Sequence, residues 1–580
     1  MRQSTIAVGI IAATFIASAA QAQTIYPINH AEILAGARFD LKVEFAGTPD
    51  AGAISVSING QDATSALGKN AEVVQREDGG DHSAFWVRGA AISKAGRYTV
   101  EASAGDAKAS VTWEVFDTNG GRKAKNVILF VGDGMTQTHR TAARVLSKGI
   151  VEGRYGGDLA MEDMPRMAMV STSGTDAIVT DSANSAAAYT TGHKSCNNAL
   201  GIYCARNKSF FDHPRVETIT DLVKRTRGMS VGIVTNTEIE DATPASMVSY
   251  TRHRRTYNEI VKMMFDAKPD VILGGGSLNF WPKSREGSKR EDEVDYIKEF
   301  QDAGYTFVTT NAELKSAGQP PKLLGLFNTG NIDGALDRFF LKKGTVSRFP
   351  DQPDLTDQMR AALAILSKND KGFFLMVESG RIDKYSHSLD WERAVYDTIM
   401  LDNAVKIGKD FAAANGETLV LVVSDHAHGT AIIGTYDDER PGTQLRDKLG
   451  TYTASKFPNY GPPNADGYPE RVDVSRRLAF VFSGYPDYCE TGRPYMDGEN
   501  RPAVVNPDDS KINIANEKYC VPGSARRAGN LPFTALSGVH AADEVVLTAM
   551  GPGAEMVRGR MENTKVFRVM VTALGLGARD

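Results

Sequence analysis

The 580-residue chain is short of cysteine, with four in all, and it has no excess of basic residues. Its 66 Lys and Arg residues are outnumbered by 71 Asp and Glu residues, so the chain lacks the basic field of a typical nucleic-acid-binding protein. It has no internal repeat and no low-complexity tract, which excludes solenoid and largely disordered architectures. Beyond the first 22 residues, no apolar run is long enough and free enough of charge to span a membrane. A folded protein with a large apolar core remains, in line with 42% hydrophobic residues.

The first residues have the pattern of a secretory signal. Arg2 supplies a positive charge, Ile6 to Ala20 form an apolar run, and Ala20-Gln21-Ala22 fits the small-x-small cleavage rule. An uncleaved membrane anchor is the alternative, but the run is shorter than a typical span. We therefore predict a signal peptide at residues 1–22, a mature chain that starts near Gln23, and a periplasmic or secreted protein.

The cysteines are even in number, which favours disulfides in an exported chain. Three pairings are possible, and the local one closes the shortest loops: Cys196 with Cys204, and Cys489 with Cys520. A zinc site of four thiolates is the alternative, but no C-x-x-C spacing supports it.

Residues 23–117 differ in pattern from the rest of the chain. Apolar and polar residues alternate with period two in four segments, and turn residues separate these segments: Phe39 to Phe45, Ile54 to Ile58, Tyr98 to Ala102 and Val111 to Val115. This pattern predicts a small antiparallel immunoglobulin-like β-domain. It contains no cluster of residues with catalytic chemistry.

Residues 118–580 follow a different rule, because continuous apolar runs alternate with helical patterns. Such runs begin at Asn126, Ser230, Asp270, Gly372 and Thr418. Strands of this type are buried on both faces, so we predict an α/β domain with a mostly parallel central sheet and helices on both faces. The Pro-, Gly- and Tyr-rich segment 435–531 is predicted to be an insertion that folds over the active-site face.

Ionisable residues stand where the predicted strands end. Asp133, Glu378 and Asp425 each follow an apolar run, and ligands of open α/β sheets bind at this edge. A glycine-flanked aspartate such as Asp133 is by itself more often a turn. The adjacent Asp425 and His426 are harder to explain as structure, because burying two ionisable groups is costly without a bound ion.

Three further positions are ambiguous when taken singly. Asp383 and His387 are four residues apart, so a helix would place both on one face, as metal ligands or as a surface pair. His540 precedes an apolar strand and could be a ligand or a structural histidine. His428 is predicted to make a supporting hydrogen bond.

Ser182 begins a stretch of small helix-forming residues, where unpaired backbone N–H groups can stabilise an anion. Arg254 lies in a basic turn and could grip two phosphate oxygens with its planar guanidinium. A solvated basic turn is the alternative, and Arg252 and Arg255 are neighbouring candidates for the same role.

Taken together and in order, these segments resemble the alkaline phosphatase family over residues 126–574. Five motifs carry the resemblance, with His540 closing the set: Val131-Gly-Asp-Gly-Met, Val179-Thr-Asp-Ser-Ala-Asn-Ser-Ala, Asp241-Ala-Thr-Pro, Ile382-Asp-Lys and Ser424-Asp-His-Ala-His. The resemblance implies a metal-dependent hydrolase of small-molecule phosphate monoesters.

The resemblance also implies roles for individual residues. Ser182 would be the nucleophile that forms a phosphoserine, and Arg254 would bind the phosphate. Two Zn²⁺ ions and one Mg²⁺ ion would be held by three overlapping sets of ligands: Asp383, His387 and His540; Asp133, Asp425 and His426; and Asp133, Thr243 and Glu378. The pair Asp241 and Lys384 resembles that of bacterial members that keep the magnesium site.

Two other functions are compatible with parts of the sequence. A phosphodiesterase or sulfatase could use the same scaffold, but it would replace the phosphate-gripping arginine or carry a cysteine at position 182. A surface-binding protein acting through its β-domain would be expected to have lost metal ligands. The family's N-terminal arm is not recognisable, so a homodimer stays open.

Overall fold

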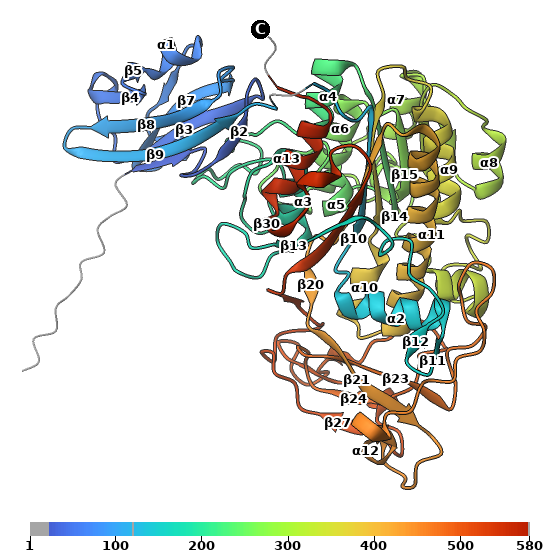
Figure 1. Ribbon diagram of the computed structural model, residues 1–580. Coiled ribbons are helices and arrows are strands. Elements are labelled where there is room, and N and C mark those ends of the chain that lie inside the picture. Colours follow the sequence, from blue (N-terminus) through green and yellow to red (C-terminus); the bar gives the residue numbers. More distant parts are fainter. Residues whose placement is uncertain (1–22, 119–120, 578–580) are drawn as a thin grey trace, which may run out of the picture.

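The computed structural model describes residues 23–118 and 121–577. The predicted signal peptide at residues 1–22 lies outside the described residues. Figure 1 shows a β-domain beside a large α/β body, and a lobe of β-strands below that body.

The β-domain is made of two sheets that enclose one apolar core. The strand orders are β1-β3-β7-β6 and β2-β9-β8-β4-β5, and all pairs are antiparallel except β2 with β9. The two-sheet antiparallel prediction is confirmed, while the immunoglobulin-like class stays a prediction. The strands are β1 Gln23–Tyr26, β2 Glu32–Leu34, β3 Phe39–Ala46, β4 Ile54–Ile58, β5 Gln61–Asp62, β6 Glu72–Val74, β7 His82–Ala90, β8 Gly96–Ala104 and β9 Ala107–Phe116.

Strand β3 is buried on both faces, although its sequence alternates. Its apolar residues face the core of the β-domain, whereas its polar residues meet the loop that follows Cys204 in the large α/β body. Asp40 accepts a hydrogen bond from the backbone of Arg215 at 3.0 Å, and Lys42 donates to Asn207 at 2.6 Å. The β-domain therefore docks through a polar strand face.

The α/β body is built on a ten-stranded sheet of order β16-β17-β15-β14-β18-β10-β19-β29-β13-β30. Only β29 runs antiparallel to its neighbours, which confirms the mostly parallel sheet. The strands are β10 Asn126–Gly132, β13 Arg166–Ser171, β14 Ser230–Glu238, β15 Val271–Gly275, β16 Thr306–Val308, β17 Leu323–Leu326, β18 Phe373–Ser379, β19 Thr418–Val423, β29 Val545–Met550 and β30 Gly559–Glu562.

Each face of this sheet has its own apolar core, because side chains of a strand alternate between faces. In β10, Val127 and Leu129 join one core, and Ile128 and Phe130 join the other. Helices that line the first core include α4 Ile219–Arg227, α6 Tyr257–Ala267 and α13 Thr564–Ala573. Helices that line the second include α2 Gln137–Lys148, α9 Leu355–Leu366 and α11 Trp391–Asn415.

The helical pattern in the sequence runs from Trp391 to Phe411, and helix α11 continues four residues beyond it, to Asn415. Asp390 caps its first turn by accepting from the backbone N–H of Arg393, and Gly416 ends it in the left-handed conformation. Glycine adopts that conformation without steric cost, so the cap residue and not the apolar pattern decides where this helix ends.

The lower lobe is formed by the chain between β20 (Ala427–His428) and β28 (His540–Ala541). These two short strands pair with each other. Its larger sheet has the order β22-β21-β23, and the lobe also has two two-stranded sheets, β24-β27 and β25-β26. The strands are β21 Thr430–Asp437, β22 Leu449–Gly450, β23 Arg476–Phe482, β24 Tyr488–Glu490, β25 Ala503–Val505, β26 Asn513–Ala515 and β27 Ala525–Arg527.

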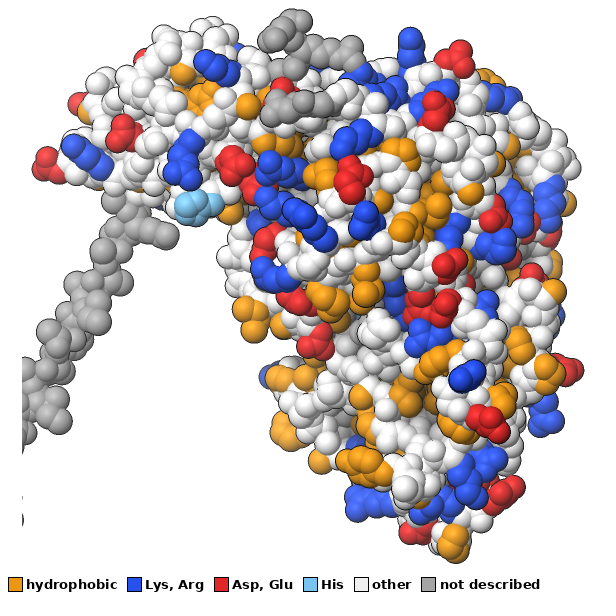
Figure 2. All heavy atoms as spheres, in the orientation of Figure 1, with side chains coloured by type: hydrophobic (Ala, Val, Ile, Leu, Met, Phe, Trp, Pro, Cys, Tyr) orange, Lys and Arg blue, Asp and Glu red, His pale blue; other side chains and the backbone are white. Residues whose placement is uncertain are grey.

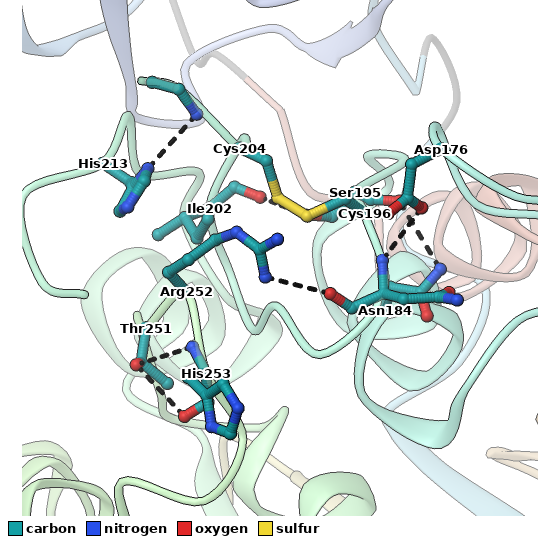
Figure 3. The surroundings of a disulfide bond; sticks show 12 residues. Asp176, Asn184, Ser195, Cys196, Ile202, Cys204, His213, Thr251, Arg252 and His253 are labelled. Carbon is teal, nitrogen blue, oxygen red and sulfur yellow. Dashed lines mark hydrogen bonds between the residues drawn. A yellow bond between two sulfur atoms is a disulfide. The ribbon is translucent and has the colours of Figure 1, made fainter. Parts of the chain in front are cut away.

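The expectation of disulfides is confirmed, and of the three possible pairings the structure has the local one. Cys489 pairs with Cys520 in the lower lobe, and Cys196 pairs with Cys204 near the β-domain (Figure 3).

Figure 2 shows positive and negative side chains interspersed on the face that it draws, with no stripe of one sign. No helix in the described part of the chain is long and apolar enough to cross a membrane.

Candidate active site and metal centre

Three neighbouring strands bring the predicted carboxylates together at one edge of the sheet. Val131 of β10 lies beside Glu378 of β18 on one side and beside Val423 of β19 on the other. Asp133 lies two residues after Val131, and Asp425 lies two residues after Val423, so all three acids are brought to this edge. Glu378 lies inside β18 rather than after it, because the strand continues to Ser379.

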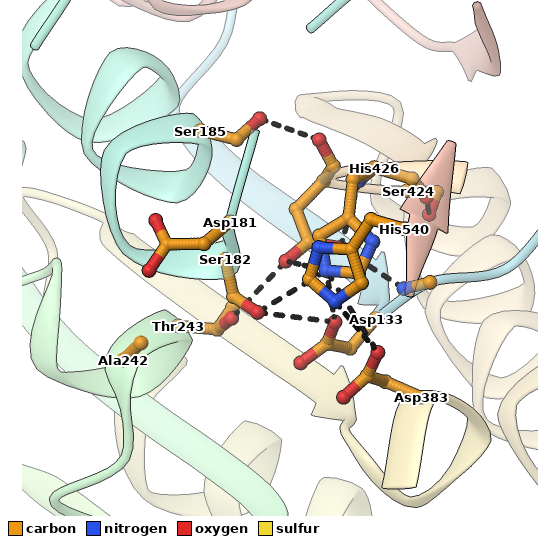
Figure 4. A network of polar contacts seen from close by, with 12 residues as sticks. Asp133, Asp181, Ser182, Ser185, Ala242, Thr243, Asp383, Ser424, His426 and His540 are labelled. Carbon is orange, nitrogen blue, oxygen red and sulfur yellow. Dashed lines mark hydrogen bonds and ion pairs between the residues drawn. The ribbon is translucent and has the colours of Figure 1, made fainter. Parts of the chain in front are cut away.

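The first cluster surrounds the hydroxyl of Ser182 (Figure 4). Nε2 of His426 lies 3.2 Å from Ser182 Oγ and 3.1 Å from Asp133 Oδ1. Ser182 Oγ is 3.5 Å from the same Asp133 oxygen, and Asp425 Oδ2 is 3.6 Å from His426 Nε2. The ligand atoms of Asp133, Asp425 and His426 lie within 4.8 Å of one another, which is close enough to hold one ion.

The second cluster is centred on one oxygen of Asp383, near the start of helix α10 (Arg381–His387). Oδ1 of Asp383 lies 3.3 Å from Nε2 of His387, 3.4 Å from Nε2 of His540 and 2.7 Å from Nε2 of His428. The four ligand atoms again lie within 4.8 Å of one another. Three ring nitrogens therefore converge on one carboxylate.

Two of these histidines have their tautomer set by the backbone. Nδ1 of His387 donates to the carbonyl of Gly538 at 2.7 Å, and Nδ1 of His540 donates to the carbonyl of Thr180 at 2.8 Å. In the neutral rings both Nε2 atoms then carry lone pairs, and they lie 3.2 Å apart. A cation between them turns this repulsion into attraction, so the donor set fits a metal ion.

The remaining predicted ligands lie at the edge of the first cluster. Thr243 Oγ1 is 3.5 Å from Asp425 Oδ2, and it comes from the short helix α5 (Ala242–Ala245) after β14. Glu378 accepts hydrogen bonds from the hydroxyl groups of Thr235 and Thr237. An all-oxygen set of this kind suits a hard cation such as Mg²⁺.

Burial makes the carboxylates of the first cluster hard to ionise. It raises the pKa of Asp425 to about 7, helped by the neighbouring charge of Asp133, and it raises the pKa of Asp133 well above its usual range. Burial likewise raises the pKa of Glu378 to about 8. For Asp383, burial acts in the same direction, but His387, His428 and His540 outweigh it and hold the pKa well below its usual value. A divalent cation would be the natural counter-charge for the acids of the first cluster.

Ser182 is the first residue of helix α3 (Ser182–Thr191), and it is almost fully buried. Asp181 caps this helix by accepting a hydrogen bond from the backbone of Asn184. The hydroxyl of Ser182 therefore sits at the positive end of a helix, where a developing negative charge is stabilised.

Arg254 reaches the same site from the loop before α6. Its guanidinium contacts Asp181 Oδ2 at 3.3 Å and Asp241 Oδ1 at 2.8 Å, and Lys384 Nζ contacts the other oxygen of Asp241 at 2.6 Å. Arg255 is exposed on the surface, and Arg252 donates to the carbonyl of Asn197. The structure thus favours Arg254 over its two neighbours.

Sequence reasoning missed the supporting residues. Asp181 was not recognised as a partner of Arg254, nor were Thr235 and Thr237 recognised as donors to Glu378. The carbonyl groups of Thr180 and Gly538 orient His387 and His540, and backbone groups leave no signal in side-chain patterns. The cap residue Asp181 could have been found from its place before a helix.

A sequence model of the family described as alkaline phosphatase matches residues 124–576. The alkaline phosphatase of Escherichia coli K12 is 33% identical over 59% of this chain and 79% of its own length, and that of Gadus morhua is 32% identical over 78% and 92%. Among solved structures, Thermus thermophilus alkaline phosphatase aligns with a TM-score of 0.54 at 25% identity, covering 79% of this chain and 92% of its own. That from the Antarctic bacterium TAB5 aligns with a TM-score of 0.53 at 21% identity, covering 79% and 100%.

The mostly parallel sheet, its acid-lined edge and the two histidine and carboxylate clusters are those of an α/β protein with candidate metal-binding sites. The chain belongs to the alkaline phosphatase family, whose model spans most of its length. It is accordingly a phosphatase that acts on small phosphate monoesters.

Proposed function

We propose that this protein is an exported phosphomonoesterase that works through a phosphoserine at Ser182. The observation that carries the proposal is the position of Ser182 Oγ, 3.2 Å from His426 Nε2 and 3.5 Å from Asp133 Oδ1 at the N-terminus of a helix. A buried serine hydroxyl held among ligand-type side chains is well placed to attack an anionic phosphorus centre.

The proposal assigns three ions to the clusters. One Zn²⁺ would be held by Asp383, His387 and His540, and the mixed nitrogen and oxygen donors suit that ion. A second Zn²⁺ would be held by Asp133, Asp425 and His426. One Mg²⁺ would be held by Asp133, Thr243 and Glu378, so the two ions would share Asp133. When bound, such ions stabilise negative charge on the entering and leaving oxygens of an in-line displacement.

The protein's own groups supply the remaining chemistry. Arg254 can present its planar fork to two phosphoryl oxygens, and Asp181 and Asp241 hold the guanidinium in place. Oγ of Ser182 forms the new bond to phosphorus as the bond to the alcohol breaks, and the alcohol leaves with a proton. Water then displaces Ser182 from phosphorus, and two inversions give net retention.

Export and domain organisation complete the proposal. We assign residues 1–22 to a signal peptide, 23–117 to an immunoglobulin-like domain and 118–580 to the catalytic domain, with 435–531 as an insertion. The two disulfides support an oxidising compartment, periplasmic or extracellular. A homodimer stays a prediction.

The test measures hydrolysis of an aromatic phosphate monoester, a diester and a sulfate by the mature, metal-loaded protein. We expect the monoester to be strongly preferred, and we expect brief incubation with labelled monoester at low pH to trap phosphate on the protein. Ser182→Ala should abolish both the label and turnover. Ser185→Ala, on the same helix but bonded to the carbonyl of Asp425, should keep both.

Two results would contradict the proposal. Preference for the diester or the sulfate would show that the substrate class is wrong and that Arg254 is misassigned. Labelling that survives in Ser182→Ala would show that another residue is the nucleophile.

A further inference from the structure

The loop closed by the Cys196–Cys204 disulfide lies against the segment that carries Arg254. Leu200 and Thr251 form an isolated antiparallel bridge, with both backbone hydrogen bonds present at 2.8 and 2.9 Å. Three residues farther on, the backbone N–H of Arg254 donates to the carbonyl of Asn198 at 2.8 Å. The backbone N–H of Arg254 is therefore tied to this loop.

The same loop is tied to the segment that leads into Ser182. The backbone N–H of Asn197 donates to Asp176 at 3.0 Å, and its side-chain amide donates to the carbonyl of Val179 at 3.3 Å. The carbonyl of Asn197 accepts from the guanidinium of Arg252 at 3.0 Å, a contact drawn beside the disulfide in Figure 3. One short loop thus joins the chain before the nucleophile to the chain that presents the arginine.

Asn198 adopts a backbone conformation that restricts which residues can replace it. Its φ is +68°, in the left-handed region. Asparagine and glycine enter this region readily, whereas a β-branched side chain makes it a costly outlier. The direction of the Asn198 carbonyl, and with it the bond to Arg254, depends on this conformation.

The β-domain contacts the loop near Cys204. Tyr26 donates its hydroxyl to the carbonyl of Cys204 at 2.9 Å, and Tyr203 is buried in the apolar core of the β-domain. The hydroxyl of Tyr203 also contacts Nδ1 of the buried His193, just after the nucleophile helix, at 2.5 Å. The loop is consequently held between the β-domain and the active site.

We propose that the Cys196–Cys204 loop, braced by the β-domain, is a positioning element for Arg254 and acts through the carbonyl of Asn198. The inference rests on the proposed role of Arg254 as the phosphate-gripping residue. The guanidinium is set by Asp181 and Asp241, and the backbone by Asn198, so both ends of the side chain are fixed before substrate binds. Such preorganisation lowers the entropy lost on gripping the phosphoryl group.

The experiment compares Asn198→Gly with Asn198→Val in the full mature chain loaded with metal. Glycine keeps the left-handed conformation, so we expect KM and the inhibition constant of inorganic phosphate within about twofold of the parent. Valine should turn the carbonyl away and raise both constants about tenfold, because a small displacement of a positioning group is costly. Metal content should be unchanged in both variants. If the valine variant fails to fold, Asn198→Ala takes its place, with an expected rise of about threefold.

A double-mutant cycle with Arg254→Ala separates this inference from the proposed function. Arg254→Ala alone should weaken phosphate inhibition, and adding Asn198→Val to it should then have no further effect. Equal constants for the glycine and valine variants would overturn the inference, as would a valine effect that persists in full without Arg254. If Arg254→Ala leaves phosphate inhibition intact, the proposed role of Arg254 fails, and the positioning inference fails with it.

Discussion

Two regions of this protein bury charged side chains in different ways, and only one of the two neutralises them with its own partners. In the β-domain, the ammonium group of Lys42 lies 2.9 Å from both Glu44 and Glu77, and Trp86 donates to Glu77 at 3.1 Å. At the edge of the central sheet, the carboxyl groups of Asp133 and Asp425 are equally buried, but their neighbours include other acids, and their pKa values are raised.

The difference separates a structural use of buried charge from a functional one. Burying an ion is costly in either place, and nearby opposite charges and hydrogen bonds can offset that cost. The β-domain network meets this need within the chain, so it requires no ligand. The cluster around Ser182 does not, because Arg254 and Lys384 are already paired with Asp181 and Asp241. Its stability and its activity should both depend on bound cations.

Metal removal should give the largest effect and should act on one region alone. Chelation is expected to lower phosphatase activity by at least about 100-fold, since metal ions contribute several kcal/mol to charge stabilisation in such reactions. It should also lower the melting temperature, because an ion that binds only the folded state stabilises that state. Activity assays and calorimetry before and after chelation, and after return of Zn²⁺ and Mg²⁺, check this. An unchanged melting temperature after verified metal loss would show that the acids are balanced in some other way.

Breaking the β-domain network should affect stability instead. Lys42→Met leaves Glu44 and Glu77 buried without their shared cation, and we expect a loss of about 3 kcal/mol or more in the free energy of unfolding. Metal content and kcat of the folded protein should stay the same, because Lys42 lies outside the site. Denaturant unfolding measures the loss, and Lys94→Met, at an exposed position of the same domain, is the matched control. If Lys42→Met changed the activity in a metal-dependent way, the β-domain network could no longer be called purely structural.

Glu392 is a buried carboxylate that lies outside both regions, and its substitution should give the smallest effect. Burial, with the neighbouring charge of Asp390, raises its pKa to about 8. In the unfolded chain the same group ionises near its ordinary pKa, so the folded state binds the extra proton. Folding stability from this group is therefore complete at low pH and is lost as the pH rises towards 8.

Glu392→Gln should remove that pH dependence. The variant and the parent should be about equally stable at pH 5, whereas at pH 9 the variant should be more stable by roughly 1–3 kcal/mol. Unfolding curves at the two pH values check the sign. A variant that is less stable at pH 9 would mean that ionised Glu392 has a favourable partner, and its burial would then resemble that of the β-domain network.

Much of the fold could be predicted because its signals are local. The apolar runs that begin at Asn126 and Thr418 predicted parallel strands of the central sheet. The period-two alternation predicted strands of the β-domain. The end of α11 was missed because Gly416, and not hydrophobicity, stops that helix. The burial of both faces of β3 was missed because it depends on a loop from residues 204–217, which no local pattern reveals.

The sequence by itself determined the family. It also determined which acidic residues stand near the ends of the strands and which side chains could serve as ligands or nucleophile. These features follow from residue type and spacing along the chain. Only the tertiary structure decided which of three arginines contacts Asp181 beside Ser182, which carbonyl groups orient His387 and His540, and that Asn198 holds the backbone of Arg254. Such facts join segments far apart in the chain through backbone groups, and every residue carries the same backbone groups, so their partners are set only when the chain has folded.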